Sequence, residues 1–147
     1  MNKSNQLVQG LAEVSLRVHD FDMMRRFYEQ VIGLETLKEI EENGGRAVFY
    51  GLGAGNELQN LALFEETMGG WSVHSKAPSI DPKRTTFHHV ALSISLHEFE
   101  SERERLKMLG VEIIRSVTSS WMKAHMFYFT DPEGNLIEYK SHDESIQ

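Results

Sequence analysis

The sequence lacks cysteine altogether, which excludes disulfide bonds, thiolate metal ligands and a cysteine nucleophile. That absence fits a protein of a reducing compartment. The sequence also lacks any block rich in lysine or arginine, and its formal net charge is −7. Because a surface that binds nucleic acid needs positive charge, nucleic acid is not an expected partner.

Long hydrophobic runs are missing as well. No apolar stretch approaches the length of a membrane-spanning helix, and the opening residues MNKSNQLVQG lack the apolar core of a signal peptide. We therefore expect a cytoplasmic protein without membrane association. With 40% hydrophobic and 25% charged residues, the composition is typical of a globular protein, and we expect one domain over residues 1–147.

What the sequence does contain is an internal repeat. EVSLRVHDF (13–21) resembles HVALSISLHEF (89–99), because both alternate apolar and polar residues as strands do and end in a polar turn. The stretch after each strand has apolar residues at helical spacing and ends at a glycine, Gly33 or Gly110. The strands recur after 76 residues, so we expect two copies of one unit.

Each half is predicted to contain a strand, a helix and three further strands. The further strands are predicted at 35–42, 46–52 and 57–66 in the first half and at 112–118, 124–130 and 135–141 in the second. We predict an α+β fold in which two βαβββ modules, 11–66 and 86–141, form one cupped mixed β-sheet with helices outside. Residues 67–85 are predicted to be a connector, and the tail HDESIQ is expected to fray.

The two adjacent histidines of FHHVAL raise the question of function. Neighbouring strand residues point to opposite faces, so His88 is expected on the helix side with Val90 and His89 on the inner side with Ala91. In the first strand, Glu13 is expected on the inner face. An ionisable residue followed by small ones leaves space in front of it, which predicts a cup that binds a small molecule.

The doubled unit, together with HHVALSIS, RRFYEQVIGLE and FYFTDPEGNLIE, resembles the vicinal oxygen chelate superfamily. That group includes glyoxalase I, extradiol dioxygenases, methylmalonyl-CoA epimerase and the fosfomycin and bleomycin resistance proteins. The resemblance spans roughly residues 11–141. It implies a homodimer and a divalent metal held in the cup by the first and last strands of the two modules.

The resemblance also implies individual metal ligands. The family's histidine just before VAL matches His89, and its last-strand glutamate matches Glu138 in GNLIE. The equivalent first-strand position of the first module holds Glu13, where the family usually has His or Gln. The repeat places Ala62 at the fourth position, which cannot coordinate, although Asn60 on the same face is a weak substitute.

One imidazole and two carboxylates from three strands leave coordination positions open for a substrate. Such an ion, with Fe, Mn, Ni or Zn as candidates, would chelate neighbouring oxygens of a small substrate and polarise them. Each ligand also has an alternative interpretation. His89 could be a hydrogen-bonded core histidine, Glu138 could pair with Lys140, and Glu13 could pair with Arg17.

His125 is a candidate general acid or base. It shares a strand face with Phe127 and Phe129, and the role requires that this face lines the cup. A histidine near solvent at a strand end is the alternative. The extradiol pattern expects a histidine several residues before the aromatic pair, but residues 119–121 read SSW, which argues against ordinary catechol cleavage.

The sequence thus leaves two functions open. The first is a metal-dependent enzyme of the glyoxalase/dioxygenase type, whether lyase, isomerase or dioxygenase, which the His89–Glu138 pair favours. The second is a metal-free small-molecule-binding protein of the bleomycin-resistance type, which Glu13 and Ala62 favour. His74, in the connector, is a further candidate for the rim of the cup.

Overall fold

The computed structural model describes residues 11, 13–42, 44–53, 59–66 and 88–147. The chain divides into two compact units, residues 1–72 and 73–147. The predicted connector 67–85, with His74, lies outside the described residues. Within the described ranges, none of the helices has the length and apolar character needed to cross a lipid bilayer.

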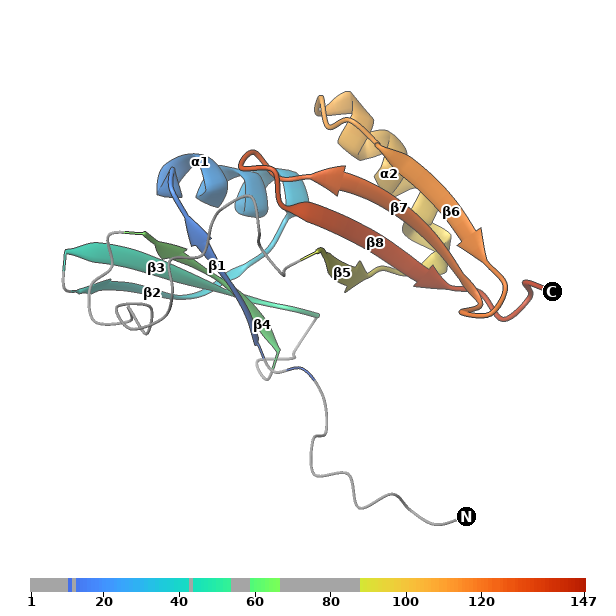
Figure 1. The fold of residues 1–147 in the computed structure, drawn as a ribbon, viewed down its shortest axis with the longest axis horizontal. Coiled ribbons are helices and arrows are strands. Elements are labelled where there is room, and N and C mark those ends of the chain that lie inside the picture. The colour runs from blue at the N-terminus through green and yellow to red at the C-terminus, as the bar shows by residue number, and fades with distance from the viewer. Residues whose placement is uncertain (1–10, 12, 43, 54–58, 67–87) are drawn as a thin grey trace, which may run out of the picture. The chain divides into compact units, whose positions relative to one another are not determined.

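The first unit contains a strand, a helical segment and three strands (Figure 1). Its elements are β1 (Glu13–Val18), α1 (Phe21–Arg26), the π-helical η1 (Phe27–Ile32), β2 (Thr36–Glu42), β3 (Gly45–Gly51) and β4 (Asn60–Glu65). The sheet has the order β1-β4-β3-β2, in which β1 is parallel to β4 and the other pairs are antiparallel.

The helical segment of the first unit begins and ends at residues suited to those positions. The Asp20 carboxylate accepts the backbone N–H of Met23 at 3.0 Å, which satisfies one of the free donors of the first turn. The segment ends at Gly33, whose φ of +84° is the left-handed conformation that glycine adopts without strain. The wider π turn aligns residues five apart, so that Phe27 and Ile32 are both buried.

The second unit repeats this architecture. Its elements are β5 (Val90–Ser93), the short 3₁₀ turn η4 (Leu96–Glu98), α2 (Phe99–Met108), β6 (Arg115–Ser119), β7 (Ala124–Thr130) and β8 (Leu136–His142). The sheet order is β5-β8-β7-β6, with β5 parallel to β8. The predicted α+β class and the two βαβββ modules are therefore confirmed.

The strand registers show that the repeat extends to single residues. In the first unit Ser15 pairs with Ala62, and in the second Ala91 pairs with Glu138, each on parallel strands. Ser15 and Ala91 are 76 residues apart in the sequence, and so are Ala62 and Glu138, which is the offset of the repeat. Ala62 therefore occupies the position in the first unit that Glu138 occupies in the second.

One face of the second sheet packs against α2. Phe99 of α2 lies 5.1 Å from Phe127 between ring centroids, and Phe127 and Phe129 both lie within 5.3 Å of Tyr139. Burying each of these rings contributes roughly 1.5–3 kcal/mol. Since strand residues alternate between faces, this core leaves Tyr128 and Glu138 on the opposite face.

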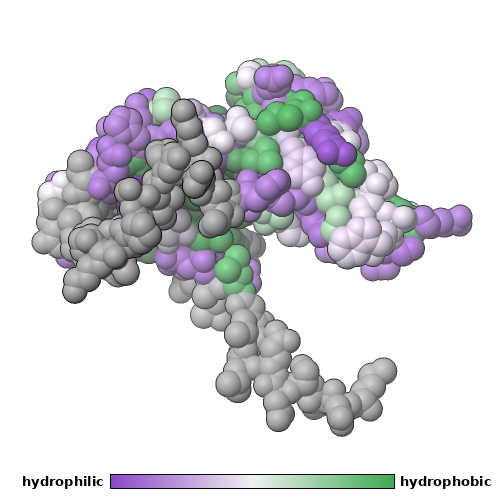
Figure 2. Space-filling view, viewed as in Figure 1, coloured by the Kyte–Doolittle hydropathy of each residue, from purple (hydrophilic) through white to green (hydrophobic). Residues whose placement is uncertain are grey.

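The surface around the end of α2 is apolar. Met108, Leu109 and Ile114 are all exposed there. Figure 2 shows the corresponding hydrophobic atoms among hydrophilic ones, over the end of α2 and the start of β6. These side chains lie outside the aromatic core that fixes the sheet.

The C-terminal tail is bound to the β6–β7 turn. The backbone N–H of Asp143 donates to the Lys123 carbonyl at 2.8 Å, and the Lys123 ammonium donates to the Ile146 carbonyl. The expectation of a frayed tail is wrong, because these bonds satisfy its backbone groups.

Candidate metal and substrate site

The turn between β7 and β8 sets the register of the site. The buried Asp131 carboxylate accepts the backbone N–H groups of Glu133 and Asn135 at 3.1 and 2.9 Å. Its other oxygen accepts the Asn135 side-chain amide at 2.8 Å. An aspartate that bonds to the backbone two and four residues on stabilises a tight turn. This turn places Tyr128 directly opposite Glu138 in the sheet.

Glu138 is the centre of a small polar cluster. Its side chain is only 6% exposed, and Oε2 lies 3.0 Å from Nε2 of His89. The Tyr128 hydroxyl donates to the Met126 sulfur at 3.9 Å and lies near enough to the same carboxylate to interact with it. A buried carboxylate is costly without partners, and the His89 ring supplies one. We refer to His89, Tyr128 and Glu138 as the Glu138 cluster.

The electrostatics of Tyr128 agree with this arrangement. Burial, and then the neighbouring Glu138 carboxylate, raise the pKa of the Tyr128 hydroxyl above its usual value. The positive charge of Arg115 acts in the opposite direction. The hydroxyl therefore remains a hydrogen-bond donor at neutral pH.

The alternative interpretations of His89 and Glu138 are not what the structure shows. The His89 side chain is 33% exposed, so it is not a core histidine. The Lys140 ammonium donates to the sulfur of Met122 at 3.4 Å, and Glu138 contacts His89 and Tyr128 instead.

His88 extends the cluster toward solvent. Its Nδ1 lies 2.6 Å from Nδ1 of His89, and the two rings meet edge to face with centroids 4.9 Å apart. His88 is exposed, so the prediction that it packs on the helix side is wrong. The ladder of β5 begins only at Val90, and strand alternation therefore does not orient the two histidines.

The spacing of His89 Nε2 and Glu138 Oε2 is that of a direct ion pair, and it also equals the separation of two neighbouring ligands of a divalent cation. Two ligands at right angles, each about 2.1 Å from an octahedral ion, lie about 3.0 Å apart. The distance from His89 Nε2 to Glu138 Oε2 has this value. Within the described part of the chain, no group of three or more His, Cys, Asp or Glu side chains could hold a metal ion.

Glu13 belongs to the first unit, at the start of β1. Its carboxylate is exposed and accepts the hydroxyl of Ser15 at 2.5 Å, rather than pairing with Arg17. Its register partner on β4 is Asn60, whose side-chain oxygen is buried without a hydrogen-bond partner among the described residues. Two oxygen donors thus lie next to each other on neighbouring strands.

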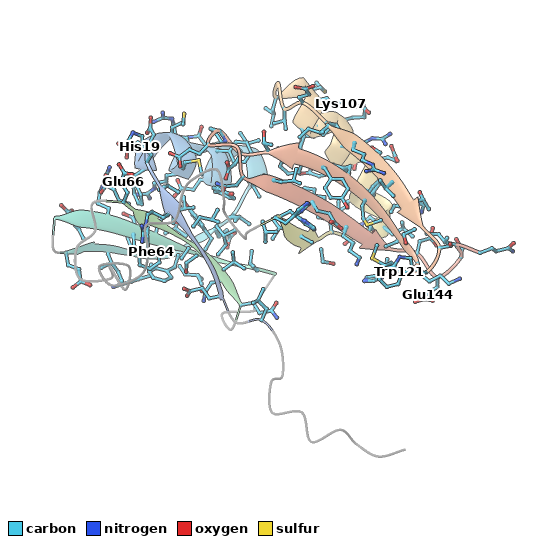
Figure 3. The ribbon with its side chains drawn as sticks, viewed as in Figure 1. His19, Phe64, Glu66, Lys107, Trp121 and Glu144 are labelled. Atoms are coloured by element: carbon cyan, nitrogen blue, oxygen red, sulfur yellow. The ribbon has the colours of Figure 1, made fainter. Side chains whose placement is uncertain are left out.

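His125 lies on the other face of the second sheet. Its ring is 5.8 Å from that of Phe99 in α2, Nδ1 lies 2.9 Å from the Thr118 hydroxyl, and Nε2 lies 3.0 Å from the Asp143 carboxylate. The structure therefore does not bring His125 together with the Glu138 cluster. The condition for its acid–base role is not met, because its face packs against α2. Figure 3 shows this end of the unit, where Trp121 and Glu144 are labelled.

Sequence reasoning missed Tyr128. The signal that identifies it is the hairpin register. Once DPEG is taken as the β7–β8 turn, pairing backward from the turn places residue 128 opposite residue 138. Only the register, and not the type of residue, distinguishes Tyr128 from the other aromatic residues of the strand.

Two basic residues share the face of the Glu138 cluster. Arg115 on β6 pairs with Tyr128, and Lys140 follows Glu138 by two residues on β8. Arg115 is exposed and Lys140 is half-buried. A carboxylate, an imidazole and two cationic side chains on one sheet face are suited to a small anionic ligand with several oxygens.

A mixed four-stranded βαβββ unit that occurs twice, with His89 beside Glu138 in the second copy, defines an α+β fold of two repeated modules. The profile of the Glyoxalase/Bleomycin resistance protein/Dioxygenase superfamily matches residues 10–139. The chain belongs to this superfamily.

Individual relatives are distant in sequence. Fosfomycin resistance protein FosX of Listeria innocua is 24% identical over 132 residues, which cover 90% of this chain and 89% of that protein. A crystal structure of a FosX mutant from Listeria monocytogenes, complexed with Mn(II) and 1S,2S-dihydroxypropylphosphonic acid, has a TM-score of 0.64, with 22% identity and 94% of each chain covered.

A lyase has the same fold. The crystal structure of lactoylglutathione lyase from Agrobacterium tumefaciens matches with a TM-score of 0.67 and 22% identity, covering 92% of this chain and 96% of the lyase. At these identities the solved structures establish the fold, and the chemistry has to be argued from this chain's own residues.

Proposed function

We propose that the protein is a metal-dependent enzyme that acts on a small anionic substrate bound through two neighbouring oxygens. His89 and Glu138 are the metal ligands of the second module, and Glu13 is the ligand of the first. The two modules are proposed to form one domain around a shared cup. The observation that carries the proposal is the 3.0 Å spacing of His89 Nε2 and Glu138 Oε2, which fits adjacent ligand positions.

The residues around the ligands have distinct roles in this proposal. Tyr128 lies directly opposite Glu138 in the sheet and limits the orientations open to the carboxylate. Arg115 and Lys140 supply positive charge for an anionic substrate group. A divalent cation, when bound, polarises the substrate oxygens for proton transfer or addition of water. Mn or Fe suits the oxygen-rich ligand set better than Zn, with Ni as a further candidate.

The substrate class follows from the same face. A compound with two neighbouring oxygens and a phosphonate or carboxylate would use both the cation and the basic side chains. The FosX structure holds Mn(II) together with such a compound, a dihydroxypropylphosphonic acid. Fosfomycin and the thiol adducts of 2-oxoaldehydes are therefore the first substrates to assay.

A homodimer and a cytoplasmic location are part of the proposal. The homodimer rests on the family resemblance, and the location rests on the absence of cysteine.

The proposal is tested by metal analysis of protein purified without chelator, followed by reconstitution with Mn²⁺. The parent protein is expected to bind about one equivalent per chain, and His89→Ala and Glu138→Ala are expected to bind none. His97→Ala and Glu144→Gln are matched controls, because both residues are exposed and lie outside the Glu138 cluster. Parent protein that binds none of Mn, Fe, Ni and Zn would refute the proposal.

A metal-free binding protein is the second candidate. It is favoured by Ala62 at the position of Glu138 in the first unit, and by a described chain that contains no set of three ligands. In that case the parent protein binds no metal after reconstitution and still binds an anionic ligand, and Arg115→Ala weakens that binding.

A further inference from the structure

Three side chains of the second unit form a hydrogen-bonded series away from the Glu138 cluster. The Thr118 hydroxyl lies 2.9 Å from Nδ1 of His125, and Nε2 of the same ring lies 3.0 Å from the Asp143 carboxylate. The three residues come from β6, from β7 and from the segment that follows β8. A hydroxyl, an imidazole and a carboxylate in this order are the groups that activate an oxygen nucleophile.

Asp143 determines which nitrogen of the neutral His125 ring carries the proton. The pKa of the Asp143 carboxyl is lowered to about 2, first by the Ser145 hydroxyl and then by His125, so the group is ionised at neutral pH. An ionised carboxylate only accepts hydrogen bonds, and the ring therefore donates to it from Nε2. Nδ1 then holds the lone pair, and the Thr118 hydroxyl donates to it. The base thus faces the proton that a nucleophilic hydroxyl must lose.

Thr118 is open to an incoming molecule. It stands on β6, the edge strand of the second sheet, and it is exposed. The two side chains behind it are less exposed, at 30% for His125 and 17% for Asp143, and the Phe99 ring lies 5.8 Å from the His125 ring. The hydroxyl can therefore meet a substrate while its base stays partly covered by the protein.

Binding of the tail does not account for the whole series. The backbone N–H of Asp143 donates to the Lys123 carbonyl at 2.8 Å, and Oδ1 of Asp143 accepts the N–H and the hydroxyl of Ser145 at 2.9 and 2.6 Å. These bonds hold the segment after β8 in place. The other carboxylate oxygen, Oδ2, contacts His125, whose far side meets Thr118. The Thr118 contact is thus available for chemistry.

We propose that Thr118 is a nucleophile for acyl transfer from activated carboxylic esters, with His125 as general base and Asp143 as a positioning residue. Oγ1 of Thr118 bonds to the carbonyl carbon while its proton passes to Nδ1 of His125. The bond from that carbon to the leaving oxygen breaks, and the proton passes to the leaving oxygen. Water then adds to the Thr118 ester, which releases the carboxylic acid and restores the hydroxyl. All three residues belong to the second unit and lie outside the proposed metal site.

The test follows release of p-nitrophenol from p-nitrophenyl acetate in the presence of EDTA, with peptide mapping by mass spectrometry to locate the acetyl group. The parent protein is expected to carry the acetyl group on Thr118. Thr118→Val keeps the branched shape without the hydroxyl and is expected to lose the reaction, whereas Thr118→Ser is expected to retain it. His125→Gln removes the base and is expected to lower the rate about 100- to 10,000-fold.

Asp143→Asn tests the positioning role. An amide can donate to Nε2 and so favour the tautomer in which Nδ1 carries the proton, and kcat is therefore expected to fall while KM stays unchanged. Ser145→Ala is the matched control, because it removes the other side-chain bond of Asp143 and leaves the contact with His125. It is expected to leave kcat unchanged. His97→Ala, which changes an exposed histidine on η4, is the control for unspecific reaction of imidazoles with the ester.

The outcomes separate this inference from the proposed function. If Thr118→Val reacts as fast as the parent, or if the acetyl group of the parent is found only on other residues, the inference is wrong. Peptide mapping of the parent needs no substitution, so it does not depend on how well a variant folds. Loss of the reaction in His89→Ala would also overturn the inference, because the reaction would then belong to the Glu138 cluster. Metal binding is measured separately, and its result leaves the role of Thr118 untouched.

Discussion

Glu138 is an ionisable residue with almost no exposure, and its carboxylate therefore depends on the donors around it. His89 stands just before β5, the strand on one side of Glu138, and Tyr128 stands on β7, the strand on the other side. At the scale of single residues, the site is thus built by satisfying one buried charge.

Removing the Tyr128 hydroxyl tests this dependence. Tyr128→Phe is expected to lower the free energy of unfolding by about 0.5–1.5 kcal/mol, because the hydroxyl no longer interacts with the carboxylate. Urea denaturation at pH 7 measures the change. In a protein that also carries Glu138→Gln, Tyr128→Phe is expected to lower the free energy of unfolding by less, because the carboxylate charge is gone. Equal costs in both backgrounds would show that Tyr128 does not act through Glu138.

The sequence predicted that His89 and Glu138 belong to one site, because each stands in a motif of the superfamily, HHVALSIS or FYFTDPEGNLIE. It misplaced His88, since alternation was applied to residues that precede the first ladder position, Val90. It left the face of His125 undecided, because strand alternation groups residues without saying which group meets a helix. The contact between Phe99 and Phe127 decides that question, and it joins residues too far apart for a local pattern to show.

At the scale of elements, the period of the hydrophobic pattern and the two glycines predicted both modules. The strand β7 was predicted with its bounds correct, whereas β6 begins three residues later than the predicted 112–118. The π-helical turn and the bound tail could not be predicted, because they depend on burial of Phe27 and on bonds between the tail and Lys123.

The tail gives a prediction about pH. The pKa of Asp143 is lowered to about 2, first by the Ser145 hydroxyl and then by His125. The pKa of an aspartate in the unfolded chain is about 3.9, so the native state favours the ionised form of Asp143. The ionised carboxylate therefore adds to the free energy of unfolding above about pH 4, and this stabilisation is lost as the pH falls toward 2. Asp143→Asn is therefore expected to lower the urea midpoint at pH 5, and the difference from the parent shrinks between pH 4 and 2.

Glu144→Gln, which changes the exposed neighbour of Asp143, is the control and is expected to keep the pH dependence of the parent. A constant difference between Asp143→Asn and the parent across this range would mean that the carboxylate charge does not stabilise the tail. The contacts of His125 with Thr118 and Asp143 would then need another explanation.

At the scale of the whole molecule, two units with one architecture carry different residues at equivalent positions. Glu13 stands where the second unit has His89, and Ala62 stands where it has Glu138. In the proposed site, the second unit supplies a pair of ligands and the first supplies a single carboxylate, with Asn60 beside it. A metal site shared by the modules would be asymmetric, with two thirds of its protein ligands from one unit.

Glu13→Gln tests whether the modules share a cation. It removes a charged ligand while keeping the shape of the side chain, so Mn²⁺ affinity is expected to fall at least about tenfold. Calorimetry measures the fall, and Glu41→Gln, an exposed glutamate of β2 in the same unit, is the matched control. An unchanged affinity would mean that the ion is held by the second unit without the first.

The same variant shows which chains build the site. Mixed dimers of Glu13→Gln and His89→Ala chains contain one intact ligand set if each site takes its modules from two chains, because both substitutions then fall in the same site. Such dimers are expected to bind Mn²⁺ at half the parent stoichiometry. If each site is made within one chain, every site carries one substitution and binding stays weak. Metal content of doubly tagged, co-purified dimers distinguishes the two arrangements.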